Sequence, residues 1–154
     1  MQINCLNLLN NKSKILDFDK VLVAVGRKPF TDGLGLENLN IKINKNGTID
    51  VDKNFQTNIE GIYAIGDVIS GPMLAHKASS EGHVFAEQLL GNKPEVNYQC
   101  IPAVVYTEPE VAWVGPSERE LETKKIAYKK GIFPFSANAR GKTTGDTTGS
   151  IKFL

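Results

Sequence analysis

Apolar positions early in the chain predict two strands that are buried on both faces. Residues 21–25 form the continuous, β-branched run VLVAV, which ends at Gly26. Residues 61–67, GIYAIGD, form a second apolar run that closes on a glycine and the carboxylate of Asp67. Uninterrupted runs of this kind are typical of strands covered on both sides in an α/β sheet.

A hairpin is predicted between these two strands. Residues 41–43 and 49–51 alternate between apolar and polar side chains on either side of Asn46-Gly47. An Asn-Gly pair between alternating segments is the strongest short-range signal for a β-hairpin.

The longest predicted element is a helix over residues 73–90. Its expected apolar stripe consists of Val84, Phe85, Leu89 and Leu90. Gly91 follows where a left-handed C-terminal cap is wanted. A strand, a short loop and this helix in succession would bring Asp67 and the amino end of the helix to one place, where α/β proteins bind ligands.

The last third of the chain changes to short strands with few crossovers. Strands are expected over residues 103–106, 111–114, 127–135 and 150–154. Ser117 and Glu120 have the spacing of a capping box and predict a short helix. We expect a separate α+β unit that begins near Tyr98, with Trp113 in its core. The final strand stops without a predicted partner, so we also expect the chain to be truncated.

Composition narrows the choice of partners. The chain has 154 residues, 41% of them hydrophobic, and a formal net charge of +1. This balance favours a globular protein and gives no electrostatic reason to expect nucleic acid or a membrane surface as partner. No apolar run is long enough to span a bilayer.

Neither the cysteines nor the histidines have the spacing of a reactive centre. Cys5 and Cys100 are far apart in the sequence, which favours two unpaired thiols over a redox pair or a zinc site. His76 and His83 lie seven residues apart in the predicted helix, without a third ligand at metal-site spacing. We therefore expect no metal site and no redox-active thiol pair.

The segment from Tyr63 to Ala78, YAIGDVISGPMLAHKA, carries the most information about chemistry. A carboxylate at a strand end can accept hydrogen bonds from ligand hydroxyl groups, and a helix start offers free N–H donors and partial positive charge. Spacing alone favours a purely structural interpretation, in which the aspartate caps a turn and the helix is buried for packing, because strand–Gly–Asp turns are common in α/β proteins.

This segment is similar to the second flavin-binding motif of the pyridine nucleotide–disulphide oxidoreductases, and its MLAHKA portion resembles the branch that oxidises dihydrolipoamide. Residues 21–29, VLVAVGRKP, resemble the end of that family's nicotinamide-binding domain. Residues 101–115, IPAVVYTEPEVAWVG, and 132–142, IFPFSANARGK, resemble its dimerisation domain. The resemblance extends from about Asp17 onward, with the motifs in family order.

The resemblance implies an α/β FAD/NAD(P)-binding fold, present in part, followed by part of an α+β dimerisation domain. Residues 1–29 would be the tail of the NAD-binding domain and residues 30–97 the FAD-binding segment. Residues 98–154 would form the first part of the dimerisation domain. The expected partners are a second copy of the complete protein and the components of a 2-oxo acid dehydrogenase complex, in the bacterial cytoplasm or the mitochondrial matrix.

The resemblance also implies cofactor-binding roles for FAD and NAD. Asp67 would accept hydrogen bonds from the flavin ribityl chain, and Gly26 would lie against the nicotinamide dinucleotide. The isoalloxazine ring would be lined by Met73, Leu74, Ala75 and His76.

The chain departs from the family in lacking its reactive groups. It has no CxxxxC redox disulphide and no GxGxxG fingerprint, and the family's His–Glu pair would lie beyond Leu154. We therefore expect the segment by itself to be inactive and to bind FAD weakly. Two other readings stay open: a related reductase for another disulphide or a metal ion, and a non-catalytic dimerisation or binding module.

Overall fold

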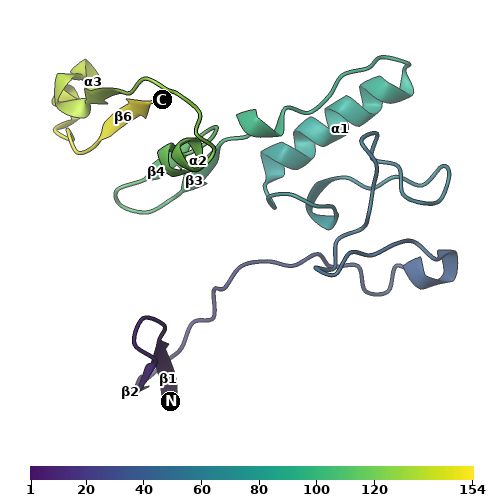
Figure 1. Ribbon diagram of the computed structural model, residues 1–154, viewed down its shortest axis with the longest axis horizontal. Coiled ribbons are helices and arrows are strands. Elements are labelled where there is room, and N and C mark those ends of the chain that lie inside the picture. The colour runs from purple at the N-terminus through teal and green to yellow at the C-terminus, as the bar shows by residue number, and fades with distance from the viewer.

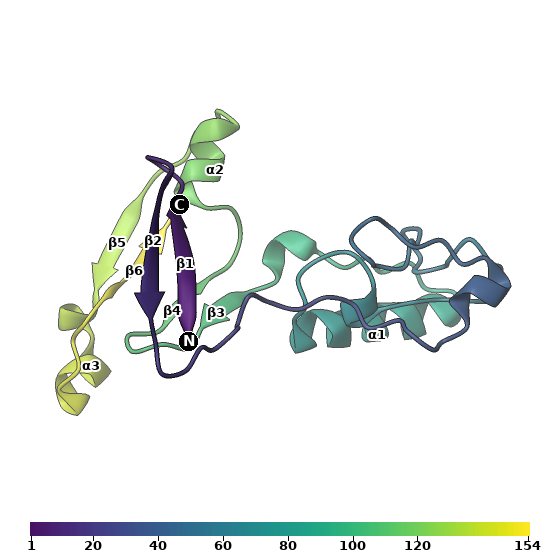
Figure 2. The same cartoon turned by 90° about the horizontal axis from the view of Figure 1, so that it is seen from below.

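The computed structural model describes residues 1–154, and Figure 1 shows them as three separate bodies joined by single stretches of chain. An N-terminal hairpin comprises β1 (Gln2–Asn7) and β2 (Lys12–Asp17). The middle body contains α1 (Ala75–Leu89) together with short 3-10 turns at Leu36–Leu39 and Gly66–Val68. Figure 2 shows α1 in a lobe of its own, apart from the strands.

The third body holds the remaining elements: β3 (Ala103–Val105), β4 (Val111–Trp113), α2 (Glu118–Thr123), β5 (Gly131–Pro134), α3 (Ala139–Thr144) and β6 (Ser150–Phe153). Its strands form two antiparallel pairs, β3 with β4 and β5 with β6. The four strands predicted here are therefore confirmed, although the one expected over residues 127–135 is shortened to β5. The final strand does have a partner within the chain.

The N-terminal hairpin was not predicted from the sequence. Gln2 pairs with Asp17 and Asn7 with Lys12, so the strands are in register over their whole length. Asparagines build the turn: the Asn7 side chain accepts from the backbone N–H of Leu9, and Asn11 adopts a positive φ of 53°. Asparagine tolerates this left-handed conformation better than most residues, which explains the turn.

The strand predicted over residues 21–25 is wrong for this chain. The segment is extended but pairs with nothing, and Leu22 and Val25 are 90% and 93% exposed. An apolar run becomes a strand only when another strand accepts its hydrogen bonds, and the nearest strands, β1 and β2, pair with each other. The run over residues 61–67 makes only an isolated bridge between Tyr63 and Gln56.

The Asn46-Gly47 turn forms as predicted. Ile43 and Ile49 make an antiparallel bridge across it, the Asn44 N–H donates to the Thr48 carbonyl at 2.8 Å, and Gly47 has a φ of 86°. Ile49 also bridges Ile69 in parallel. The hairpin is thereby tied to the turn that precedes α1.

A small core lies between this hairpin and α1. Its buried members are Ile41, Ile49, Phe55, Ala64, Ile69 and Val84. Phe85 adds edge contacts to the core, with ring centroids 6.4 Å from Phe55 and 4.8 Å from Tyr63. Leu89 and Leu90, predicted to share the apolar stripe, are instead 64% and 77% exposed, because the helix turns its last residues away from the core.

Two helix termini follow the predicted chemistry. Gly91 has a φ of 86°, its N–H donates to the Gln88 carbonyl, and the N–H of Asn92 donates to the Glu87 carbonyl. This is the Schellman pattern that closes a helix on glycine. At the start of α2, Ser117 and Glu120 form both hydrogen bonds of the capping box.

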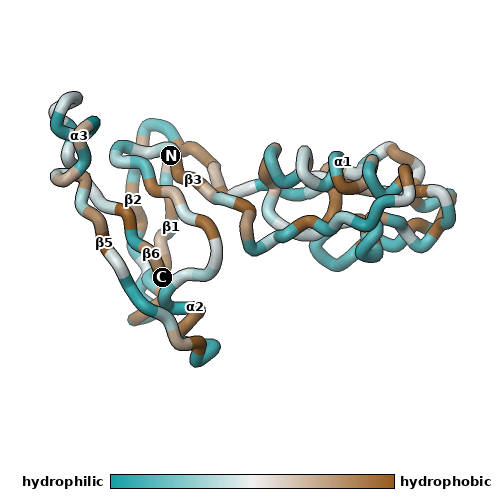
Figure 3. Tube along the Cα trace, turned by 90° about the horizontal axis from the view of Figure 1, so that it is seen from above, coloured by the Kyte–Doolittle hydropathy of each residue, from teal (hydrophilic) through white to brown (hydrophobic).

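The molecule exposes much more surface than a compact domain of its mass. Its accessible area is 12661 Å², whereas the size scaling of folded monomers gives roughly 7,700 Å² for 16.9 kDa. Trp113, predicted to lie in a core, is 52% exposed. Figure 3 shows hydrophobic residues spread over both ends of the molecule rather than gathered in one centre. No helix combines the length and the apolar character needed to cross a lipid bilayer.

Candidate functional site

The turn that carries Asp67 packs directly on α1. Residues Gly66–Val68 form a single 3-10 turn, and Gly66 has a φ of 78°, where a side chain is disfavoured. A Cβ at this position would lie 3.3 Å from the Cβ of Ala78. Glycine is therefore required both by the backbone conformation and by the closeness of α1.

A buried ion pair on α1 holds the backbone of Gly66 from both sides. The N–H of Gly66 donates to Oε2 of Glu81 at 2.7 Å, and Nζ of Lys77 donates to the Gly66 carbonyl at 2.9 Å. The same Nζ lies 3.1 Å from Oε1 of Glu81, and both side chains are 0% exposed. The charges of the two residues thus neutralise each other. Glu81 binds the peptide group before Gly66, and Lys77 binds the peptide group after it.

Tyr98, in the segment between α1 and β3, joins this hydrogen-bond network. Its hydroxyl group donates to Oε1 of Glu81 at 2.8 Å. Burial, together with the hydrogen bond to the Glu81 carboxylate and its negative charge, raises the pKa of Tyr98 to about 12. Tyr98 therefore stays protonated at any physiological pH and keeps donating.

Sequence reasoning did not find Lys77, Glu81 or Tyr98. A lysine and a glutamate four residues apart on a helix usually mark a solvated face. The available signal was position: Lys77 and Glu81 lie two turns and one turn before Val84 on the same helix face, which is buried. Extending the apolar stripe toward the amino end of the helix would have identified both.

The amino end of α1 is open to an anionic group. The helix begins at Ala75, after Leu74, with no side-chain cap and no acidic residue in its first turn. Its first backbone N–H groups are thus left without intrahelical partners, and the helix dipole makes them electropositive. This end lies beside the turn of Asp67, as predicted, because Gly66 is bonded to Lys77 in the first turn of α1.

The predicted ring-lining residues lie at this helix start with different exposures. Met73 and Leu74 are half-buried, whereas Ala75 and His76 are exposed. Nε2 of His76 lies 2.8 Å from the carbonyl oxygen of Pro102, which makes Nε2 the protonated ring nitrogen in that hydrogen bond. His76 thus connects α1 to the segment that leads into β3.

Asp67 and the turn after Gly26 are brought close together. A carboxylate oxygen of Asp67 lies 3.9 Å from Nη2 of Arg27, and the two side chains are 40% and 74% exposed. Such an exposed pair holds Asp67 only weakly, so the carboxylate remains able to accept hydrogen bonds from a ligand. Gly26 has a φ of 112° and open space where a Cβ would stand.

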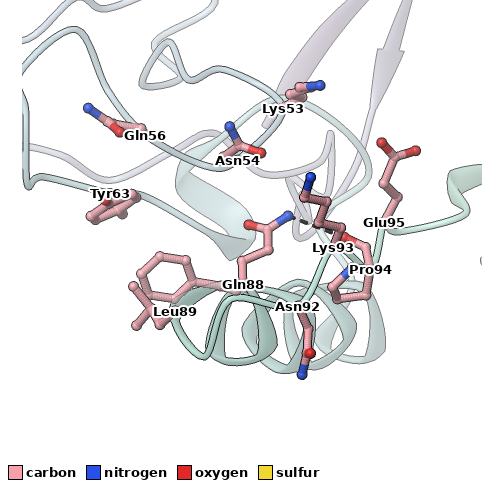
Figure 4. Close-up of a pocket in the computed structure, with 11 residues that line it drawn as sticks. Lys53, Asn54, Gln56, Tyr63, Gln88, Leu89, Asn92, Lys93, Pro94 and Glu95 are labelled. Carbon is pink, nitrogen blue, oxygen red and sulfur yellow. Dashed lines mark hydrogen bonds between the residues drawn. The ribbon is translucent and has the colours of Figure 1, made fainter.

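Two cavities in the middle body are lined by residues other than Asp67 and residues 73–76. One of about 440 Å³ lies between residues 53–56 and the carboxyl end of α1 (Figure 4), where Nε2 of Gln88 donates to the Pro94 carbonyl. Another of about 580 Å³ is lined in part by Ile69 and Tyr98. Neither contains Asp67 or residues 73–76, so the predicted contacts form an open surface rather than the wall of either cavity.

The chain has no thiol pair at this site. Cys5 and Cys100 are both exposed and free, and no group of three or more metal-ligating side chains gathers anywhere in the structure. What the site offers is binding chemistry: a half-exposed carboxylate, an uncapped helix end and a fixed turn between them.

Comparisons with known proteins match both halves of the chain. Residues 3–82 match the family described as pyridine nucleotide-disulphide oxidoreductase, and residues 101–154 match the dimerisation domain of the same family. Curated proteins named mitochondrial dihydrolipoyl dehydrogenase, from Mesocricetus auratus and Homo sapiens, are 52% identical over 143 residues. These alignments cover 93% of the chain but 30% and 28% of the relatives, so the chain spans less than a third of their length.

Solved structures show the same arrangement of elements. LpdA from Mycobacterium tuberculosis matches with a TM-score of 0.79 and 28% identity, over 93% of this chain and 31% of that one. The HOCl-induced flavoprotein disulfide reductase RclA from Escherichia coli matches with a TM-score of 0.78 and 28% identity, over 93% of this chain and 33% of that one.

The predicted fold class is confirmed by these matches: part of a dinucleotide-binding fold is followed by part of a dimerisation domain. The glycine turn that carries Asp67 and the uncapped helix beside it lie in the half of the chain that matches the first of these domains. This chain belongs to the pyridine nucleotide–disulphide oxidoreductase family.

Proposed function

We propose that the chain is a segment of a dihydrolipoyl dehydrogenase, the enzyme that oxidises dihydrolipoamide to lipoamide and passes the electrons through FAD to NAD⁺. The observation that carries this proposal is the 52% identity to proteins of that name over 93% of the chain. The 28% identity to a flavoprotein disulfide reductase of a different name gives less support to another substrate.

The residues at the amino end of α1 suit a flavin. Asp67 is half-exposed and bonded only loosely to Arg27, so its carboxylate can accept hydrogen bonds from the ribityl hydroxyl groups. The open N–H groups that follow Leu74 can stabilise negative charge at the pyrimidine edge of the ring. When bound, the flavin supplies the two-electron chemistry, and the protein tunes it with such fixed dipoles.

Several side chains would then have positioning roles rather than reactive ones. Met73 and Leu74 present apolar surface at the start of α1, and Ala75 leaves the helix end unobstructed. His76 is engaged with the Pro102 carbonyl, so it would orient the neighbouring segment beside the ring rather than act as a base. Gly26 would allow close approach of the nicotinamide dinucleotide, because no side chain stands there.

The complete protein would act as a homodimer within a 2-oxo acid dehydrogenase complex. The match of residues 101–154 to a dimerisation domain supports a second copy as partner, as does the exposure of apolar residues such as Val111, Trp113 and Phe153. For location, the sequence leaves the bacterial cytoplasm and the mitochondrial matrix open, and the curated relatives named above are mitochondrial proteins.

Turnover assays on the complete protein that carries this segment test the proposal. We expect NAD⁺ reduction that depends on dihydrolipoamide. In the reverse direction, NADH oxidation by lipoamide should exceed by orders of magnitude NADH oxidation by glutathione disulphide or a metal ion. A preference for either of the latter would favour a related reductase and contradict the proposal.

The isolated segment is expected to show no such turnover. Its two cysteines are exposed and unpaired, so no redox disulphide is present to accept electrons from the substrate. Measurable lipoamide or diaphorase activity of purified residues 1–154 would overturn this expectation.

A further inference from the structure

Burying the charged side chains of Lys77 and Glu81 in a small core is energetically unfavourable. Removing two opposite charges from water carries a large desolvation penalty, and apolar residues of similar size often serve stability equally well. Both charged groups nevertheless form a hydrogen bond with the same residue, Gly66. Glu81 accepts from its N–H, and Lys77 donates to its carbonyl oxygen.

We propose that Lys77 and Glu81 are positioning residues that set the direction of the Asp67 carboxylate relative to the amino end of α1. The inference rests on the proposed function, in which Asp67 binds the flavin ribityl chain. Asp67 directly follows Gly66, so fixing the polar groups on both sides of Gly66 limits the orientation of the peptide that leads into Asp67.

The same two residues also fix the helix end against the turn. Lys77 lies in the first turn of α1, so its bond to the Gly66 carbonyl joins the open N–H groups and the carboxylate in one rigid unit. The backbone of Gly71 packs closely against the aliphatic part of the Lys77 side chain, since a Cβ at Gly71 would lie 3.1 Å from Cε of Lys77. Tyr98 supports Glu81 from the other side through its hydroxyl group.

A purely structural role would give the same contacts, so the test must separate stability from flavin binding. The measurements are the dissociation constant of FAD for the complete apoprotein and the unfolding temperature of that apoprotein. The variants are Lys77→Met and Glu81→Gln, each made in the otherwise unaltered protein and again in the Asp67→Asn protein. Lys42→Met is the matched control, because Lys42 is exposed and its side chain makes no bond.

We expect Lys77→Met and Glu81→Gln to weaken FAD binding about 10-fold or more when Asp67 is present. In the Asp67→Asn background the same changes should add less than about 2-fold, because a positioning residue acts only through the group that it positions. Lys42→Met should change neither quantity. Equal losses in both backgrounds, or losses that follow the unfolding temperature alone, would overturn the inference.

A milder variant covers the case in which the core substitutions prevent folding. Tyr98→Phe removes only the hydroxyl group that supports Glu81, at a residue that is 48% exposed. It should weaken FAD binding several-fold with Asp67 present and leave it unchanged with Asp67→Asn. An unchanged affinity with Asp67 present would contradict the inference.

Failure of the inference can be told from failure of the proposed function. If the complete protein binds no flavin, or Asp67→Asn binds it as tightly as the unaltered protein, the proposed role of Asp67 falls and the inference falls with it. Asp67→Asn can weaken FAD binding while its effect simply adds to that of Lys77→Met and to that of Glu81→Gln. In that case only the positioning role is lost.

Discussion

Glu118, in the third body of the molecule, shows how one residue can join three elements. Its carboxylate accepts hydrogen bonds from Lys130 at 2.9 Å, Lys152 at 3.1 Å and Tyr128 at 3.0 Å. These donors lower the pKa of Glu118 to about 2 and tie α2 to β6 and to the segment that leads into β5. The charge of one carboxylate thus fastens much of the third body together.

The lowered pKa of Glu118 predicts a loss of local stability in acid. A carboxyl group whose pKa is lower in the folded state stabilises that state fully above its ordinary pKa of 4.5, and the contribution fades as the pH falls toward about 2. The protection of the β5 and β6 amides against hydrogen exchange, relative to the intrinsic exchange rate at each pH, should therefore fall over this window in the complete protein. In Glu118→Gln the protection should already be reduced at neutral pH, without a further step in acid. A step of unchanged size in the variant would show that another group is responsible.

At the scale of elements, local chemistry predicted termini and turns well and buried charges poorly. The capping box at Ser117, the turn at Asn46-Gly47 and the glycine cap at Gly91 all form, because each depends on residues within a few positions. The strand at residues 21–25 and the burial of Lys77 depend instead on partners elsewhere. The residues within a few positions do not determine whether such a partner is present.

Gly91, which follows α1, and Gly82, inside α1, make a matched test of the helix terminus. Gly91→Ala places a side chain at a φ of 86° with no neighbour within 4 Å, so the cost is backbone strain of about 1 kcal/mol. Gly82→Ala lies inside the helix with ordinary contact to Ile65 at 3.6 Å and should stabilise α1 by up to about 1 kcal/mol. Exchange protection of α1 amides in the complete protein should move in opposite directions in the two variants. Movement in the same direction would contradict this account of the helix end.

At the scale of the whole molecule, the chain has surfaces that only other partners can cover. Only 12 of its 154 residues are buried, and the exposed apolar side chains include Leu22, Val25, Trp113 and Phe153. The matches to solved structures extend over 93% of this chain and 31% and 33% of theirs, so this open arrangement of bodies corresponds to a segment of those longer chains. The sequence predicted the family and the fold class, but not which apolar runs would lack a partner.

The exposed surface predicts that isolated residues 1–154 associate. Apolar patches of this extent are seldom tolerated on a monomer in water. Sedimentation velocity over a range of concentrations should show an average mass that rises above 16.9 kDa. A single monomeric species at every concentration would mean that the isolated chain buries its apolar surface in some other way.

Flavin titration of the complete apoprotein with Asp67→Asn tests the central claim most directly. A hydrogen bond to a charged carboxylate contributes about 1.5–3 kcal/mol, so FAD should bind roughly 10- to 100-fold more weakly than to the unaltered protein. Asp50→Asn, at an exposed carboxylate, should leave the affinity unchanged. An Asp67→Asn protein that binds FAD with undiminished affinity would contradict the assignment of this turn to the flavin.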